Sequence, residues 1–254
     1  MKYNISTCSF YKIRIKRLLE LPNDFGVEFM SDFDSDQVFD SFLEQIKEKG
    51  NHGVFSIHGP FALVDPANDS DEEKLLKDLT AGFDLYHKCN AHNYVIHTHA
   101  AISKPGDEEY LKTTRELVTS RMYKLNEIAK REGVHIAIEN LIAPLFNQEQ
   151  FLQLFKDISD VECQIDVGHA VVSGYDIYEI QKALKDRISG YHLHNNNGKA
   201  DTHARIRDGV YTWEKFVQGA REFTPNALGT FEYMDCLDLE AYQADREYLE
   251  TLLI

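Results

Sequence analysis

Short apolar runs alternate with longer amphipathic segments along the whole chain. Each short run is rich in β-branched and aromatic residues, a pattern typical of strands that are buried on both faces of a parallel sheet. Eight such runs occur, at residues 3–8, 25–30, 53–59, 93–99, 134–140, 163–169, 188–195 and 228–234.

The amphipathic segments between these runs show the spacing of helices that bury one face. The first starts on a capping-type Ser35–Asp36 pair and ends on Gly50, which are typical helix boundaries. The predicted helices cover residues 35–50, 72–89, 108–133, 147–158, 176–186, 212–223 and 238–253.

Strands that alternate with helices predict a parallel sheet with helical crossovers. Eight such units in 254 residues fit a (β/α)8 TIM barrel of the α/β class. No Pro/Ser-rich linker or low-complexity tract breaks the rhythm, so we expect one TIM-barrel domain over residues 1–254. The alternative is an open doubly wound sheet. Its nucleotide-binding version has no support, because no G-x-G-x-x-G motif follows an early strand.

The composition narrows the classes of protein further. A hydrophobic content of 43% excludes a disordered chain. The net charge of −15 argues against broad binding to a phosphate backbone, so nucleic acid is not the expected partner. The four cysteines lie far apart with no CxxC pair, which is typical of free thiols in a reducing compartment. The first residues form no apolar signal stretch, and no run of 18 apolar residues occurs; we therefore expect a cytoplasmic protein that does not associate with a membrane.

Residues typical of metal sites stand at or just after the carboxyl ends of the predicted strands, where TIM barrels carry their chemistry. So many ionisable groups in one barrel mouth would be costly to bury, and a bound divalent cation would remove that cost. Imidazole and carboxylate ligands without cysteine suit a catalytic Zn²⁺ or Mn²⁺ ion. The strand-end residues are His58, His97, Glu139, Asn140, Asp166, His169, His192, Asp201, His203 and Glu232.

Other polar residues are more simply interpreted as structural. His135 begins a predicted strand and would face the opposite end of the barrel. His99 and His194 each lie two residues past a better candidate and would pack locally. His87 would lie on a helix surface. Glu28, within the second strand, could anchor a loop or touch a substrate.

Several segments resemble motifs of the xylose isomerase-like TIM barrels. This superfamily contains sugar and sugar-phosphate isomerases and epimerases and also endonuclease IV. The resemblance covers nearly the whole chain and lies in "IHGPF", "VIHTHA", "IAIENL", "IDVGHAVVSGYD", "HLHNNNGKADTH" and "GTFEY". The chain departs from the family at Asn195, where Asp is frequent, at "RIRDG", where "GxG" is usual, and at "HTH", which replaces "HPG". These departures concern substrate-contact loops more than ligands.

The resemblance implies a set of metal ligands for each branch of the superfamily. The isomerase and epimerase branch implies one ion, and the endonuclease IV branch implies three zinc ions. All nine positions of the larger set are filled here, so we expect one to three ions. The smaller set is Glu139, Asp166, His192 and Glu232, and the larger set adds His58, His97, His169, Asp201 and His203.

The first functional hypothesis is a metal-dependent isomerase or epimerase acting on a sugar, sugar phosphate or related polyol. The metal would bind a carbonyl and an adjacent hydroxyl oxygen. Glu139 and Glu232 would be the catalytic residues that remove and return the proton next to the carbonyl. The candidate substrate-binding residues are Glu28, Asn140, Lys199 and Arg205.

Lys199 and Arg205, together with Arg207, could meet a phosphate or another acidic substituent. A solvated loop is the simpler interpretation of these three residues.

Two other hypotheses stay open. One is an endonuclease IV-like, zinc-dependent phosphoester hydrolase, which the filled set of nine positions favours and the acidic balance opposes. The other is a non-catalytic sugar-binding barrel, which the intact carboxylate and histidine set opposes. A small carbohydrate is the expected partner, and the sequence leaves open whether the chain forms a homo-oligomer.

Overall fold

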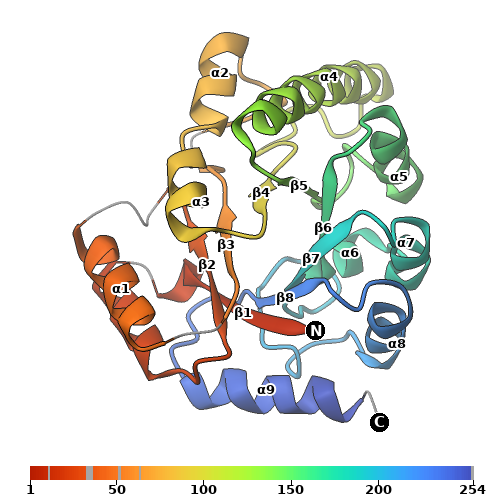
Figure 1. The fold of residues 1–254 in the computed structure, drawn as a ribbon. Helices are drawn as coiled ribbons and strands as arrows, with labels where there is room; N and C mark the ends of the chain where they lie inside the picture. The colour runs from red at the N-terminus through yellow and green to blue at the C-terminus, as the bar shows by residue number, and fades with distance from the viewer. Residues whose placement is uncertain (11, 33–36, 51–52, 63, 253–254) are drawn as a thin grey trace.

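Eight parallel strands form a closed barrel at the centre of the computed structural model, and helices surround it (Figure 1). The structure describes all residues except 11, 33–36, 51–52, 63 and 253–254. The strands are β1 (Lys2–Ser6), β2 (Gly26–Met30), β3 (Phe55–His58), β4 (Tyr94–Ile96), β5 (Ile136–Glu139), β6 (Glu162–Asp166), β7 (Ile188–Leu193) and β8 (Leu228–Phe231). Because β1 pairs with β8 as well as with β2, the barrel closes. The predicted (β/α)8 fold is confirmed, and the open-sheet alternative is wrong.

The outer layer follows the predicted alternation of strands and helices. Two 3-10 segments, η1 (Thr7–Ser9) and η2 (Lys12–Glu20), follow β1. The helices are α1 (Gln37–Glu48), α2 (Glu72–Leu79), α3 (Phe83–Cys89), α4 (Glu108–Glu132), α5 (Gln148–Asp157), α6 (Val167–Ser173), α7 (Ile177–Ala183), α8 (Glu214–Phe223) and α9 (Leu239–Thr251). The predicted first residues at Ser35–Asp36 and the predicted last residue of the 238–253 helix lie outside the described residues.

The structure corrects the helix predictions at two points. The predicted helix 72–89 is broken between α2 and α3, where Gly82 passes the ring of Tyr94; a Cβ at Gly82 would lie 2.6 Å from the Tyr94 hydroxyl oxygen. That hydroxyl donates to the carbonyl of Leu79 and so fixes the end of α2. The expected strand 163–169 ends at Asp166, and α6 begins at the next residue.

Side chains that pack against the helices show which of their strand neighbours point into the barrel. Phe29 packs against Phe39 and Phe42 of α1, and its neighbour Glu28 is buried on the inner face. Tyr191 packs against α8, so the next residue along β7, His192, points inward, because successive strand side chains alternate between faces. All strands run in one direction, so their carboxyl ends meet at a single rim.

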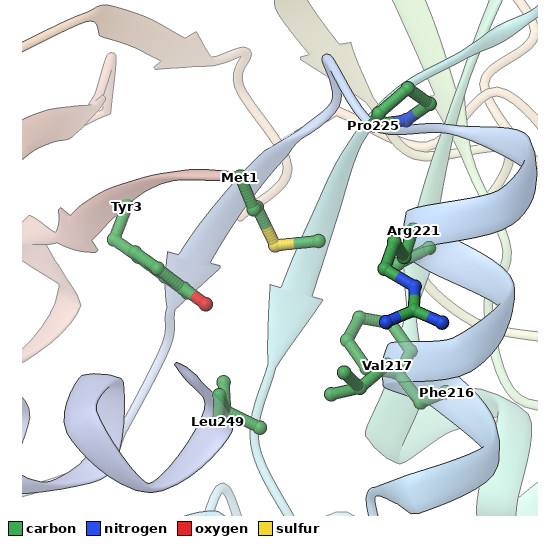
Figure 2. A pocket seen from close by; sticks show the side chains of 8 residues that line it. Met1, Tyr3, Phe216, Val217, Arg221, Pro225 and Leu249 are labelled. Atoms are coloured by element: carbon green, nitrogen blue, oxygen red, sulfur yellow. The ribbon is translucent and has the colours of Figure 1, made fainter. Parts of the chain in front are cut away.

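The opposite end of the barrel contains an apolar cavity of about 160 Å³ between β1, α8 and α9. Figure 2 shows Met1, Tyr3 and Leu249 facing Val217 and Arg221 across this space. Because β1 starts here, the cavity lies at the amino ends of the strands, away from the rim where the candidate ligands gather.

In the part of the chain that the structure describes, no helix is both long enough and apolar enough to cross a membrane.

Candidate metal centre

All nine side chains that the sequence nominates as metal ligands lie at the carboxyl rim of the barrel. They form overlapping groups in which potential ligand atoms lie within 4.8 Å of one another. The groups share members, so the centre is one continuous cluster. Three of these groups together include eight of the nine candidates. The ninth, Glu232, forms one further group with His192 and another with His203.

The first group consists of His58 at the end of β3, His97 after β4 and Glu139 at the end of β5. Glu139 Oε2 lies 3.6 Å from His58 Nε2 and 3.2 Å from His97 Nε2. His58 Nδ1 lies 2.8 Å from the carbonyl oxygen of Gly59, which turns Nε2 toward the carboxylate. Anchoring the second ring nitrogen in this way is typical of histidine ligands.

The second group surrounds the Nδ1 atom of His192 with three carboxylates, two at the ends of β5 and β6 and one directly after β8. This nitrogen lies 3.4 Å from Glu139 Oε1, 3.5 Å from Asp166 Oδ2 and 3.2 Å from Glu232 Oε2. Glu139 therefore belongs to both the first and the second group. A carboxylate that links two groups of ligands can bridge two ions or serve one of them.

The third group lies nearer to solvent and consists of His169 on α6 with Asp201 and His203 from the loop after β7. Asp201 Oδ2 lies 3.1 Å from His169 Nε2 and 2.8 Å from His203 Nε2. The Nδ1 atoms of the two rings lie 3.0 Å from the carbonyl oxygens of Asn140 and Glu232. Both rings therefore turn Nε2 toward one point. His203 has a φ of 45°, a strained conformation that is frequent at functional sites.

The charges in the cluster depend on one another. Burial would raise the pKa of Glu139 and Asp166, but the neighbouring histidines outweigh it and hold both pKa values well below the ordinary range. Burial would lower the pKa of His169, but Asp166 and the other carboxylates raise it well above its ordinary value. The pKa of His203 is likewise raised to about 9 beside Asp201. The metal-free cluster thus keeps its carboxylates ionised by keeping these imidazoles protonated.

The donor atoms fit a divalent cation. Four buried atoms that face the groups have no hydrogen bond: Glu139 Oε2, His192 Nδ1, His194 Nδ1 and Asp201 Oδ1. Buried polar atoms without partners are rare because they are costly. A cation that accepts lone pairs from carboxylates and imidazoles would satisfy them, and this donor set suits Zn²⁺ or Mn²⁺.

The structure corrects the prediction that His194 packs locally. His194 is fully buried, its Nε2 lies 2.8 Å from Asp166 Oδ2, and its ring stacks on His203 with centroids 4.0 Å apart. Gly168 makes room for this ring, since a Cβ there would lie 2.0 Å from it. The signal was present in the sequence: His192 and His194 are two residues apart and so face the same side of a strand.

Glu28 lies beneath the cluster rather than in its mouth. It is 1% exposed, and its Oε1 lies 2.9 Å from His192 Nε2. Its Oε2 accepts a hydrogen bond from Ser56, which in turn accepts one from Asn4. This buried relay holds the His192 ring so that Nδ1 faces the three carboxylates. Both carboxylate oxygens of Glu28 are thus used within the protein. Glu28 is the hydrogen-bond partner of the candidate ligand His192, and its predicted contact with a substrate stays a prediction.

The other predicted substrate-binding residues are occupied or lie apart from the cluster. The Asn140 side chain donates to the carbonyl of Asp166 and accepts from its N–H, so it joins β5 to β6. Arg205 makes two hydrogen bonds to the fully buried Asp245 of α9. Internal partners take these polar groups of Asn140 and Arg205, and substrate binding by either residue stays a prediction. Lys199 is exposed on the loop, and its role stays a prediction.

His87 and His135 lie where the sequence placed them. His87 is exposed on α3, and His135 pairs with Glu162 at the amino end of the barrel. His99 is buried beside Thr98, and burial together with the charge of His97 lowers its pKa to about 4. It also lines a cavity of about 550 Å³ that opens onto His97 and His169. This cavity is the space next to the cluster in which a substrate could lie.

A closed parallel barrel with carboxylates and imidazoles at its carboxyl rim defines a class of TIM-barrel metal site. Residues 20–252 match the family described as xylose isomerase-like TIM barrel, and the chain belongs to that family.

Similar proteins share this fold. MJ1614, an uncharacterized protein of Methanocaldococcus jannaschii, is 28% identical over 162 residues, which is 60% of each chain; the match thus spans about three fifths of that relative's length. Among solved structures, a D-tagatose 3-epimerase-like protein superposes with a TM-score of 0.83 at 18% identity, covering 99% of this chain and 98% of that one. The IOLI protein with a bound zinc atom superposes with a TM-score of 0.77 at 13% identity, covering 100% and 98%.

We predict that Arg205 stabilises the fold. Arg205→Ala leaves the carboxylate of Asp245 buried without its cation, and we expect the free energy of unfolding to fall by about 3 kcal/mol. Lys199→Ala, on the exposed part of the same loop, is the control and should change it by less than about 0.5 kcal/mol. Chemical denaturation of the metal-free proteins measures both. Equal stabilities would show that the pair contributes nothing.

Glu28→Gln should weaken metal binding. Glutamine keeps the shape of the relay but removes the charge that fixes and polarises His192, so zinc affinity should fall by about 10- to 100-fold. Ser56→Ala, which removes only one hydrogen bond to Glu28, should cause a smaller loss. Competition with a chelator measures both affinities. If Glu28→Gln binds zinc as tightly as the unmodified protein but binds substrate more weakly, Glu28 contacts the substrate directly and does not act through His192.

Metal affinity should rise with pH. A metal ion and a proton compete for the Nε2 atom of His203, whose pKa in the metal-free protein is about 9. Below that pH the proton must leave before the ion binds, so apparent affinity should increase from pH 7 to pH 9 and then level off. Chelator competition across this range, with proton release followed by calorimetry, is the measurement. Constant affinity between pH 7 and pH 9 would contradict it.

Proposed function

We propose that the protein is a metal-dependent isomerase or epimerase of a sugar or related polyol. The observation that carries this proposal is the pair of carboxylates, Glu139 and Glu232, which approach the same nitrogen of His192 from β5 and from the end of β8. The cavity that His97 and His169 of the cluster line has a volume of about 550 Å³, which lies within the usual range for small-molecule sites. The resemblance in fold to a D-tagatose 3-epimerase-like protein supports the same class of reaction.

The chain's own residues suggest how the proton would move. A carbonyl compound bound next to the cluster would place its adjacent C–H group beside the two carboxylates, both of which lie within 3.4 Å of His192 Nδ1. Glu139 or Glu232 would take the proton from the carbon next to the carbonyl, and the other would return it to that or the neighbouring carbon. A bound divalent cation would supply polarisation of the carbonyl and hydroxyl oxygens. Asn140 and Glu28 would keep β5, β6 and His192 in place during the transfer.

The proposed cofactor is Zn²⁺ or Mn²⁺, in one to three copies. The core ligands would be Glu139, Asp166, His192 and Glu232, and the further ions would use the groups formed with His58 and His97 and with His169, Asp201 and His203. The zinc atom in the similar IOLI protein supports a metal of this type, as do the buried ligand groups.

A second candidate function is an endonuclease IV-like, zinc-dependent phosphoester hydrolase. One observation favours it: the nine nominated side chains fall into groups that could hold more than one ion. Two or three ions can activate a water molecule and stabilise a leaving oxygen. Elemental analysis of the purified protein separates one ion from three.

We also infer that the protein works in a reducing, cytoplasmic environment, because all four cysteines are free thiols.

Glu139→Gln should abolish the activity, and Glu28→Gln should only weaken it. Removing the proposed base should lower the rate at least about 100-fold, because the proton next to the carbonyl loses its acceptor. The assay is exchange of solvent deuterium into a broad panel of ketoses, with metal content measured in parallel. Equal losses in both variants, at equal metal content, would show that the catalytic centre is misplaced. Phosphodiester cleavage without any exchange would favour the hydrolase.

A further inference from the structure

The loops that surround the candidate site are strongly acidic. Among the described residues between the last residue of each strand and the first residue of the next helix, ten are Asp or Glu and four are Lys or Arg. The loops at the carboxyl rim of the barrel therefore carry more acidic than basic side chains.

Three of the four cations in these loops contact groups of the protein itself. Arg205 binds the buried carboxylate of Asp245. The guanidinium of Arg207 lies over the ring of Tyr248 at 5.4 Å, and the ammonium of Lys104 lies over the ring of Tyr110 at 5.8 Å. Lys199, the fourth, is exposed.

Four helix amino termini on this face are also occupied. A phosphate group often binds at such a terminus, where backbone N–H groups are unpaired. Here an aspartate caps each of four helices that follow strands and accepts a hydrogen bond from an N–H group of the first turn. These residues are Asp71 at α2, Asp107 at α4, Asp166 at α6 and Asp238 at α9.

The wall of the substrate cavity is apolar. Nine of its twelve lining residues are apolar and the other three are histidines. Phe61 stands above the rings of His58 and His97, with centroids 5.1 and 5.4 Å away. Ile102 and Ile142 belong to the loops after β4 and β5. Among the described residues that line this cavity, none is a lysine or arginine.

We infer that the substrate is an uncharged sugar or polyol. Beyond the carbonyl and hydroxyl oxygens that would face the cation, it carries no phosphate group. A phosphate monoester bears nearly two negative charges at neutral pH and binds proteins through arginine, lysine or helix amino termini. In this protein those groups are paired, capped or outside the cavity, and the surrounding loops would repel the anion. A neutral sugar can place its C–H groups on the apolar wall and its oxygens toward the cluster. This inference rests on the proposed function, because it takes a sugar as the substrate.

The test compares ribitol with ribitol 5-phosphate as ligands of the zinc-loaded, full-length protein. Calorimetry gives both dissociation constants without requiring turnover. We expect ribitol to bind at least 10-fold more tightly, and we expect higher ionic strength to strengthen binding of the phosphate while leaving ribitol unchanged. Inorganic phosphate, measured alone, shows how much of the affinity of ribitol 5-phosphate comes from direct contact with the ions. If ribitol 5-phosphate binds as tightly as ribitol, or more tightly, the inference is overturned.

Two variants sharpen the comparison. Lys199→Ala should leave the ratio of the two dissociation constants unchanged, because the inference gives that side chain no role in phosphate recognition. A selective loss of ribitol 5-phosphate binding would overturn the inference. Ile142→Arg puts a cation on the apolar wall and should shift the ratio toward the phosphate by about 10-fold; an unchanged ratio would show that charge at the cavity does not govern selection.

The failure of this inference can be distinguished from failure of the proposed function. Deuterium exchange into ketose phosphates but not into free ketoses would keep the isomerase or epimerase and overturn the inference. Absence of exchange from every ketose, with ribitol still binding more tightly than its phosphate, would overturn the reaction while keeping the preference for an uncharged ligand.

Discussion

The contact on which the rest of the site depends is the approach of three carboxylates to one nitrogen of His192. Glu139, Asp166 and Glu232 come from parts of the chain far apart in sequence, and only a closed parallel barrel brings them to one ring atom. In an open sheet, β1 would not pair with β8, and the outer strands would carry their carboxyl ends away from the others. Barrel closure is thus as much a condition of the chemistry as the ligands themselves.

This arrangement has an energetic consequence for the metal-free protein. Buried carboxylates are tolerated only while imidazoles beside them stay protonated, and ion pairs of this kind recover little more than the cost of their desolvation. Part of the stability of the apolar barrel therefore offsets a cluster that is poorly satisfied by itself, as the unpaired atoms of Glu139, His192 and Asp201 show. The same atoms make the cluster receptive to a cation. The same requirement holds for Glu28, which is a buried anion behind His192. It is stable there only because Ser56 and the imidazole of His192 both donate to it.

Much of the fold and the position of the site could be predicted from the sequence because both follow local rules. Alternating strand and helix patterns determine a parallel sheet, and parallel strands carry their ends to one rim, so residues such as His58 and Asp166 could be placed together without a structure. Long-range partners could not. Nothing near Arg205 indicates that Asp245, 40 residues later, would bind it, and nothing near Asn140 indicates that it would join the backbone of β6. The break between α2 and α3 depends on Tyr94, which belongs to the next strand. His194 is different, because its spacing of two residues from His192 on one strand already places both side chains on the same face.

The acidic loops and the ligand cluster act on the same quantity, the electrostatic potential at the barrel mouth, but over different distances. Within a few ångströms, the carboxylates would attract and hold the proposed cation, which would then offer a local positive charge to carbonyl or hydroxyl oxygens. Farther from the ion, beyond its ligands, the aspartates of the surrounding loops contribute to the potential, and salt screens their effect beyond about 8–10 Å. A neutral ligand that binds through oxygens at one end is attracted by the cation and is not repelled by the carboxylates of the loops. An anion attached several bonds away from those oxygens meets both the attraction and the repulsion, which is why a charge distribution that favours loading of the metal also selects against phosphorylated substrates.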